Sequence, residues 1–202
     1  MQVLARRAGR SYVRSLAPGA SVLSLPNLIT IARILMVPVI VWAIGSGAML
    51  FAFLLFLAAG VSDAVDGFLA KRFGMSSAVG AYLDPLADKA LIVSIYVALG
   101  INDALPRWLV ILVVSRDIMI VAAVMLSWLM EKPVEVKPLA VSKANTAAQI
   151  ILATLVLAKH GLSLELDWLI LAGIAAVAAL TLASIAAYVR EWVRHMGSVE
   201  AR

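Results

Sequence analysis

The sequence of 202 residues has no cysteine, only two histidines and few charged residues. Without cysteine the chain has no disulfide, no thiolate metal site and no cysteine nucleophile. The histidines, His160 and His195, stand apart near the ends of apolar segments, where an interfacial role is the simplest interpretation. Charged residues make up 14% of the chain and hydrophobic residues 63%, which excludes an ordinary soluble domain. This composition predicts an integral membrane protein.

Long apolar runs occupy most of the sequence. A transmembrane helix needs about 20 mostly apolar residues, so the chain has room for roughly six of them and for no additional soluble domain. The fold class that we expect is all-α, an integral membrane bundle of six transmembrane helices over residues 23–202. The apolar segments lie at about 28–46, 49–70, 82–101, 107–130, 143–158 and 166–190.

Residues 1–22 have a different composition, rich in arginine and free of acidic residues. Leu4, Ala8, Tyr12 and Leu16 recur every four residues, which predicts an amphipathic helix on the membrane surface. A cleaved organellar presequence has a similar composition. A mitochondrial inner membrane therefore stays open beside a bacterial inner membrane.

Basic residues give the chain a net charge of +5. Most basic residues outside the apolar segments lie on the side of the six-helix arrangement that holds both termini. Only Arg107 and Lys159 lie on the other side. This asymmetry predicts cytoplasmic termini. Basic residues beside apolar segments are typical of contacts with the headgroups of membrane lipids, and we expect no nucleic-acid partner.

Four aspartates lie within 26 positions of one another in the second and third apolar segments. An aspartate at the centre of a transmembrane helix costs about 2.5 to 3.5 kcal/mol on insertion scales, so each one calls for an explanation. Helical spacing places Asp63 and Asp66 on one face, and Asp84 and Asp88, four residues apart, on one face of the next segment. A short turn between the segments predicts antiparallel neighbours, so that the four carboxylates converge near the cytoplasmic end.

Converging carboxylates repel one another in a low dielectric unless a counter-charge is present. Oxygen ligands without nearby histidine or cysteine suit Mg²⁺ or Mn²⁺. The small residues Gly67, Ala70 and Gly80 leave room for a planar group beside the carboxylates. A site with two metal ions and such a slot fits a nucleotide pyrophosphate. The alternative is that the acids form buried ion pairs with Lys71, Arg72 and Lys89.

The run from Asp63 to Asp88 resembles the signature of the CDP-alcohol phosphotransferase family: Asp, two residues, Asp-Gly, two residues, Ala-Arg, eight residues, Gly, three residues, Asp, three residues, Asp. Every spacing agrees, but Lys71 stands where the family has arginine, so the planar fork is lost. The resemblance implies a homodimer that uses CDP-diacylglycerol at a cytoplasmic site. It implies metal ligation by Asp63, Asp66, Asp84 and Asp88, and it makes Asp88 the catalytic base for the acceptor hydroxyl.

A second motif, from Pro26 to Arg33, resembles the first helix of the bacterial phospholipid synthases in this family, where it helps to close the nucleotide site. The alternative is an ordinary helix start with Arg33 as a cation that extends to the interface. The resemblance implies nucleotide binding by Asn27, Thr30, Arg33, Gly67, Ala70, Lys71 and Gly80.

The acceptor alcohol is predicted from two later motifs, which start at Ser115 and Ser142. Both look most like the cardiolipin synthases of the family, whose acceptor is phosphatidylglycerol. The near relatives are phosphatidylglycerophosphate synthases, which use glycerol 3-phosphate. Arg116 and Lys143, taken to lie at helix starts, are expected to bind the acceptor phosphate. Alternatively, Arg116 pairs with Asp117 or with a neighbouring helix.

Apolar residues after Lys143, including Ile150, Ile151, Leu152 and Leu155, favour a lipid acceptor. Two other classes of protein remain as alternatives. A secondary transporter would place its carboxylates near the midplane of broken helices. A non-catalytic scaffold would leave the four costly acids without a purpose.

Overall fold

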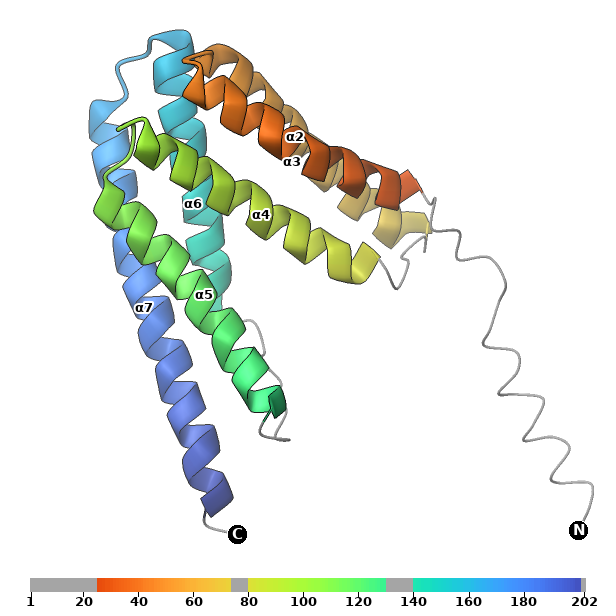
Figure 1. Ribbon diagram of the computed structural model, residues 1–202, viewed down its shortest axis with the longest axis vertical. Coiled ribbons are helices and arrows are strands. Elements are labelled where there is room, and N and C mark those ends of the chain that lie inside the picture. Colours follow the sequence, from red (N-terminus) through yellow and green to blue (C-terminus); the bar gives the residue numbers. More distant parts are fainter. Residues whose placement is uncertain (1–24, 74–79, 130–139, 201–202) are drawn as a thin grey trace, which may run out of the picture.

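The computed structural model describes residues 25–73, 80–129 and 140–200, which form helices with short connections (Figure 1). No strand occurs in these ranges, so the all-α prediction is confirmed for them. The amphipathic helix expected at 1–22 lies outside the described residues. The helices are α2 (Leu25–Gly45), α3 (Met49–Phe73), α4 (Gly80–Ile101), α5 (Arg107–Leu129), α6 (Ala140–Leu162) and α7 (Asp167–Glu200).

The helices extend beyond some of the apolar segments from which they were predicted. Helix α6 starts at Ala140 instead of residue 143, and α7 continues to Glu200 instead of residue 190. An apolar segment marks only the part of a helix that suits lipid, whereas backbone hydrogen bonding continues into polar turns. The start of α6 and the end of α7 therefore include polar residues that a search for apolar segments leaves out.

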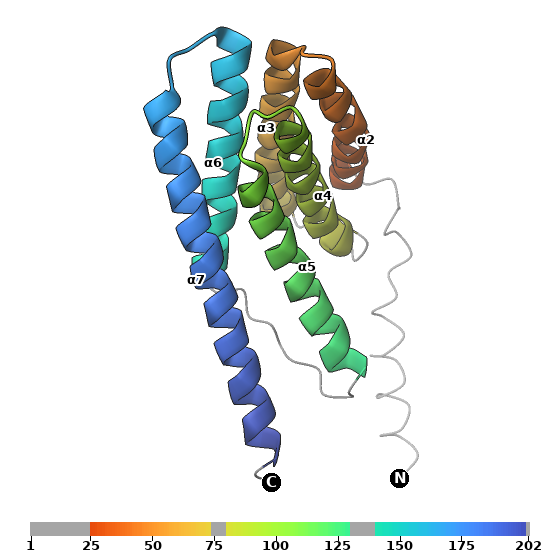
Figure 2. The ribbon, with the colours of Figure 1, turned by 60° about the vertical axis from the view of Figure 1, so that its left-hand side comes forward.

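Three tight connections lie at one end of the bundle, at the top of Figure 2. They join α2 to α3, α4 to α5 and α6 to α7. Each contains a residue with positive φ: Gly47 at 78°, Asp103 at 55° and Ser163 at 54°. Consequently α2, α4 and α6 begin at the opposite end, where α3 and α5 finish. The N-terminal half of α2, the C-terminal half of α3 and the N-terminal half of α4 share that end.

Helix α2 packs against both α3 and α4, while α6 packs against α3, α4 and α7. Helix α5 packs between α4 and α7. Helices α3 and α4 run in opposite directions, as predicted, but in the described part of the chain they do not pack directly against each other, so the prediction of direct neighbours is wrong. The chain forms helical hairpins from α2 with α3 and from α4 with α5, and α2 and α6 connect α3 to α4.

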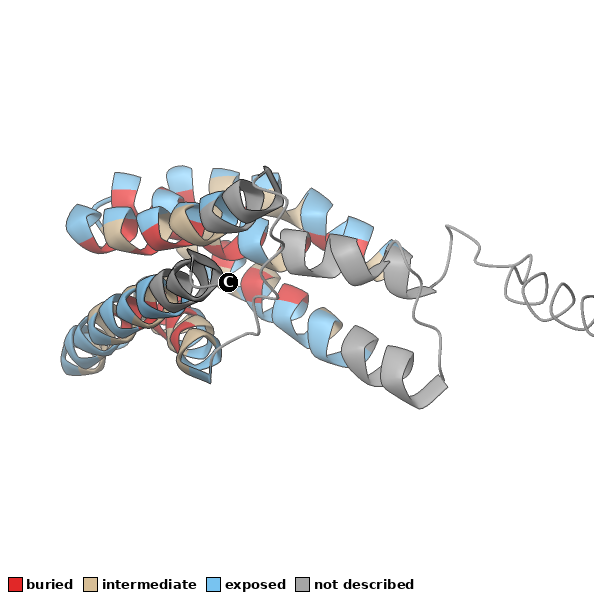
Figure 3. Ribbon diagram, turned by 90° about the horizontal axis from the view of Figure 1, so that it is seen from below, coloured by how far each residue is buried: buried red, intermediate tan, exposed pale blue. Residues whose placement is uncertain are grey.

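The apolar core lies on the inner faces of the helices, coloured red in Figure 3, and the outer faces are exposed. Ile40, Ile95, Leu99 and Leu152 are fully buried. Large apolar side chains are exposed on the outside, among them Trp42, Leu54, Ile111, Trp168 and Leu171. An apolar exterior of this kind fits a lipid environment.

Three described segments are long and apolar enough to cross a membrane: Leu28–Gly45 in α2, Ala140–Leu162 in α6 and Asp167–Glu191 in α7. Helix α3 contains a shorter apolar stretch, Met49–Val65. Six membrane crossings therefore stay a prediction, although the alternating direction of the helices is compatible with it.

Candidate active site

Three helices meet at a buried arginine. Arg33 in α2 is only 1% exposed, and its guanidinium reaches both Asp63 in α3 and Asp88 in α4. Nη2 lies 2.8 Å from Asp63 Oδ1, and Nη1 donates a hydrogen bond of 2.7 Å to Asp88 Oδ1. The fork of the guanidinium matches two carboxylates from separate helices. Arg33 thus joins α2 to a residue that lies 55 positions later in the chain.

Asp63 and Asp88 are accessible in spite of this ion pairing, since their side chains are 51% and 47% exposed. Asp66 lies one turn after Asp63, and Asp84 one turn before Asp88, but the side chains of Asp66 and Asp84 lie outside the described residues. No group of three or more candidate metal ligands occurs among the side chains that are described. Asp63 and Asp88 are half-exposed, and both contact Arg33. Their carboxylate oxygens are the type of ligand that Mg²⁺ and Mn²⁺ prefer.

A cavity of about 520 Å³ lies next to these carboxylates. Arg33, Asp63 and Asp88 line it together with Lys89 and Asp117. Its walls are mostly apolar and come from α3, α4 and α6, and they include Phe56, Leu57, Leu91, Ile92 and Ile150. The cavity explains the absence of direct packing between α3 and α4, because it occupies the space between them. A charged group and an apolar chain can therefore be held in one place.

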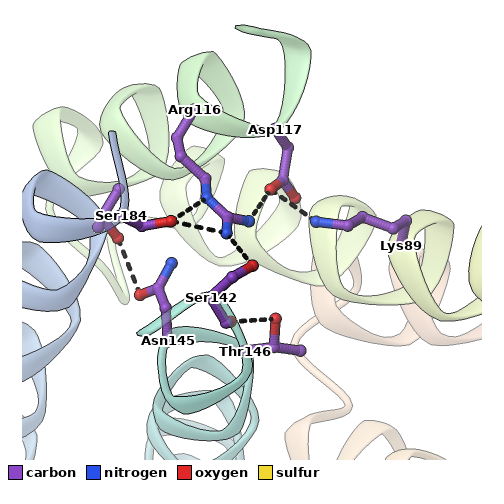
Figure 4. A network of polar contacts seen from close by, with 8 residues as sticks. Lys89, Arg116, Asp117, Ser142, Asn145, Thr146 and Ser184 are labelled. Atoms are coloured by element: carbon purple, nitrogen blue, oxygen red, sulfur yellow. Dashed lines mark hydrogen bonds and ion pairs between the residues drawn. The ribbon is translucent and has the colours of Figure 1, made fainter. Parts of the chain in front are cut away.

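A second polar network joins α4, α5, α6 and α7 (Figure 4). Arg116 is 1% exposed and donates from Nη1 to Asp117 at 2.5 Å, and from Nε and Nη2 to Ser184 at 3.2 and 2.9 Å. Nη2 also donates to Ser142 Oγ at 2.5 Å. The Tyr188 ring lies 5.9 Å from the guanidinium carbon. All three guanidinium nitrogens of Arg116 are thus occupied by protein groups.

The two residues predicted to bind the acceptor phosphate lie in different surroundings. Arg116 lies in the middle of α5, so its predicted position at a helix start is wrong. It makes the contacts with Asp117 and neighbouring helices that the sequence left as the alternative. Lys143 does lie near the start of α6, where its side chain is exposed and is not part of the cavity wall. Apolar residues continue the helix on both sides of Arg116, so Arg116 lies far from either end of α5.

The predicted nucleotide-binding residues are described only in part. Thr30 is buried in α2, one turn before Arg33. The structure does not describe the side chains of the other predicted members of this set, so their role stays a prediction: Asn27, Gly67, Ala70, Lys71 and Gly80.

Residues 23–189 match the family described as CDP-alcohol phosphatidyltransferase. The chain belongs to this family. The match includes every helix of the bundle up to the last turns of α7, and it includes both carboxylates that Arg33 joins. Members of the family generally use a divalent metal, in agreement with the oxygen donors that Asp63 and Asp88 present.

Curated relatives include two kinds of phosphatidyltransferase. The chain is 37% identical over 82% of its length to the chloroplastic "CDP-diacylglycerol--glycerol-3-phosphate 3-phosphatidyltransferase 1" of Oryza sativa. It is 36% identical over 67% of its length to the "Cardiolipin synthase (CMP-forming)" of Homo sapiens. It is 34% identical over 68% of its length to a "Cardiolipin synthase (CMP-forming) / mitochondrial hydrolase fusion protein" of Schizosaccharomyces pombe. The matched parts are 56%, 50% and 26% of these relatives, respectively.

Sequence reasoning missed several residues of the two polar networks. Ser184 and Thr181 hold Arg116 and Asn145 from α7, and nothing in the sequence linked them to those partners. Their signal was weak: two small hydroxyl residues, three positions apart, inside an otherwise apolar segment. Gln149 also went unassigned, although a buried amide in an apolar helix needs a polar partner.

Proposed function

We propose that the chain is a membrane enzyme that transfers a phosphatidyl group from CDP-diacylglycerol to phosphatidylglycerol, with cardiolipin and CMP as products. The observation that carries this proposal is the pair of half-exposed carboxylates, Asp63 and Asp88, held by Arg33 at the polar end of an apolar cavity. Family membership supports the class of reaction. The apolar walls support a substrate with acyl chains.

In the proposed reaction, the acceptor hydroxyl attacks the phosphorus atom that bears the diacylglycerol, and the bond from that phosphorus to the CMP oxygen breaks. Asp88 accepts the hydroxyl proton as general base, in line with its half-exposed carboxylate on the cavity wall. Arg33 positions the Asp88 carboxylate through Nη1.

The residues that would hold Mg²⁺ or Mn²⁺, two ions by analogy with other carboxylate sites, are Asp63, Asp66, Asp84 and Asp88. Bound metal would neutralise the pyrophosphate of the donor and the charge that develops on the departing CMP. Arg33 contributes a further positive charge at the same place. The small residues Gly67, Ala70 and Gly80 follow or precede these carboxylates in α3 and α4, and they would leave room for the nucleotide.

The acceptor is the finer part of the proposal. Phosphatidylglycerol is favoured because Leu57, Leu91 and Ile150 form apolar cavity walls that suit a lipid. Glycerol 3-phosphate is the second candidate, which would make the chain a phosphatidylglycerophosphate synthase. The rice relative, which matches 82% of the chain, favours this second reaction.

The proposal includes the setting of the enzyme. We propose a homodimer in a bacterial inner membrane, or alternatively a mitochondrial one, with six crossings and cytoplasmic termini. The candidate spans in α2, α6 and α7 support membrane integration. A secondary transporter is less compatible with this fold, because α3 and α4 continue without a break through Asp63 and Asp88.

The decisive experiment supplies the purified full chain with labelled CDP-diacylglycerol and Mn²⁺ together with one acceptor at a time: phosphatidylglycerol, glycerol 3-phosphate, inositol phosphate or serine. Cardiolipin formed only with phosphatidylglycerol supports the proposal. Phosphatidylglycerophosphate formed from glycerol 3-phosphate would favour the second candidate. Product from none of the four would contradict both.

A matched pair of variants ties the reaction to the site. Asp88→Asn removes the proposed base, whereas Asp103→Asn makes the same change in an exposed ion pair with Arg107 at the other end of the bundle. We expect turnover to disappear only in the first variant. Equal activity in both would show that Asp88 does not carry the reaction.

A further inference from the structure

The polar end of the cavity has two separate groups of charges. The first is Arg33 with Asp63 and Asp88, where two carboxylates share one guanidinium. The second is Asp117, whose Oδ1 accepts from both Arg116 Nη1 and Lys89 Nζ, the latter at 2.6 Å. Two cations share one carboxylate in this second group. It therefore has a positive charge in excess, next to a cavity that it lines through Lys89 and Asp117.

The two cations of the second group differ in their freedom to bind a ligand. Arg116 is 1% exposed, and all of its nitrogens donate to Asp117, Ser142 or Ser184. Lys89 is 47% exposed, lines the cavity and uses its ammonium group for the bond to Asp117. An ammonium group has three donors. Lys89 can thus bind an anion in the cavity, whereas the buried Arg116 does not line the cavity and uses four of its five N–H donors for protein groups.

Gln149 supplies a second, independent indication of a ligand at this place. Its side chain is 2% exposed and lines the cavity from α6, yet its Nε2 has no hydrogen-bond partner. Its backbone carbonyl accepts from the Tyr96 hydroxyl at 3.1 Å, which ties this turn of α6 to α4. A buried donor without a partner is destabilising, and in a native protein it is commonly satisfied by a ligand or by water.

We propose that Lys89 and Gln149 form the subsite for the phosphate of the acceptor, and that Arg116 is a positioning residue that acts through Asp117. This inference rests on the proposed phosphatidyl transfer. It assigns phosphate recognition to Lys89 instead of Arg116, because the Lys89 ammonium reaches the cavity and the Arg116 guanidinium is enclosed by protein. Ser142 and Ser184 anchor Arg116 from α6 and α7, so that Asp117 can hold Lys89 at the cavity wall.

The position of Lys89 suits both candidate acceptors. In phosphatidylglycerol and in glycerol 3-phosphate, the attacking hydroxyl lies at the opposite end of a three-carbon glycerol from the phosphate ester. Lys89 directly follows Asp88 in α4, and both residues line the cavity. A phosphate bound to Lys89 and Gln149 would therefore place the acceptor in the cavity that the proposed base also lines. The shared chemistry is a glycerol phosphate ester, as a diester in one acceptor and as a monoester in the other.

The test is steady-state kinetics of the full chain with each acceptor varied separately. We expect Lys89→Met to raise the KM for the acceptor about tenfold to a hundredfold, the range for loss of a hydrogen bond to a charged group, while the KM for CDP-diacylglycerol stays within about twofold. Lys89→Arg should recover most of the loss because it keeps the charge. The matched control is Lys159→Met, since Lys159 pairs with Asp167 at the opposite end of the bundle. It should leave both KM values unchanged.

Gln149→Leu supplies a readout that a purely structural role would not give. The variant removes an unpartnered donor and keeps the backbone carbonyl that binds Tyr96, so its thermal midpoint should be equal to or above that of the parent. The KM for the acceptor should nevertheless rise severalfold. A lower midpoint with an unchanged acceptor KM would overturn the role of Gln149.

Outcomes for this subsite can be distinguished from outcomes for the enzyme itself. If the parent transfers to no acceptor, the proposed function fails, and the subsite is then judged by the thermal shift that phosphatidylglycerol or glycerol 3-phosphate causes without CDP-diacylglycerol. A shift present in the parent and lost in Lys89→Met supports the subsite; an equal shift in both overturns it. If the parent is active, an unchanged acceptor KM in Lys89→Met, or a raised KM for CDP-diacylglycerol in its place, overturns it. If Lys89→Met does not fold, Lys89→Arg and Gln149→Leu decide by the same measurements.

Discussion

The bridge that Arg33 forms between α2, α3 and α4 can be tested by replacing Arg33 with methionine. The guanidinium lies 2.8 Å from Asp63 and 2.7 Å from Asp88, and the side chain is 1% exposed. Methionine fills a similar volume without charge. The variant therefore removes both ion pairs and keeps much of the apolar packing around the side-chain stem.

Several opposing contributions set the size of the effect. The hydrogen bond from Nη1 to Asp88 contributes about 1.5 to 3 kcal/mol. The ion pair of Nη2 with Asp63, which is not a hydrogen bond, contributes about 1 kcal/mol or less. Asp63 and Asp88 are 51% and 47% exposed, and water screens both pairs. Arg33 Nε is buried without a hydrogen-bond partner, and the variant removes that cost of about 1 to 3 kcal/mol. We expect a net loss of about 1 to 2 kcal/mol in the free energy of unfolding.

The assay is thermal unfolding of the purified full chain in detergent, first in EDTA and then in Mn²⁺. The matched control is Arg107→Met, because Arg107 pairs with Asp103 where the two side chains are 72% and 74% exposed. An exposed pair of this kind contributes about 0.5 kcal/mol or less. In EDTA, Arg33→Met should unfold several degrees below the parent, about 2 to 4 °C for each kcal/mol lost.

Mn²⁺ should restore part of that loss, since a cation that binds only the folded state stabilises it by mass action. The variant leaves Asp63 and Asp88 without their shared counter-charge, so it should respond to Mn²⁺ more strongly than the parent does. The reasoning is refuted if Arg33→Met and Arg107→Met unfold at the same temperature in EDTA. In that case the buried bridge would contribute no more than an exposed pair.

Three further predictions concern the metal, the base and the helix packing. Excess EDTA should abolish transfer and Mg²⁺ or Mn²⁺ should restore it, measured as CMP release; full activity in EDTA would contradict the metal proposal. Asp88→Asn should retain CDP-diacylglycerol binding in an equilibrium assay but lose turnover, and turnover near the parent rate would mean that the base is another residue. Gly161→Ala should lower the free energy of unfolding by about 1 to 3 kcal/mol through overpacking, and the thermal midpoint with it. The added Cβ would lie 2.8 Å from Leu50 Cα. Gly45→Ala, with nothing within 4 Å of its Cβ, is the control, and equal midpoints would contradict close packing of α6 on α3.

The helices themselves were predictable from sequence. Every apolar segment became a helix, although α6 and α7 extend beyond the expected limits, because the length and composition of a segment decide whether it forms a helix that suits lipid. The four carboxylates could be chosen as candidates from the sequence. The spacing of Asp63, Asp66, Asp84 and Asp88 is a property of the chain, and so is the mismatch between acidic residues and apolar surroundings.

The partners of the charged residues depended on the tertiary structure. The sequence offered Arg33 as a nucleotide ligand or as an interfacial cation, but in the fold it bridges two aspartates from other helices. It offered Arg116 as a phosphate ligand or as a partner of Asp117 or a neighbouring helix, and in the fold Asp117, Ser142 and Ser184 enclose Arg116. Lys89, considered only as an ion-pair partner, does form such a pair, with Asp117, and it also lines the cavity.

The physical reason is the range of the interactions. Helix formation and apolar patterning depend on residues within a few turns of one another, so both can be judged along the chain. Whether a cation is enclosed or faces a cavity depends on how separate helices pack, and α3 and α4, joined by a short segment, lie on opposite sides of the cavity in place of packing together. Spacing along the chain thus made the four carboxylates candidates, whereas helix packing determined which cations meet Asp63 and Asp117 and which cation lines the cavity.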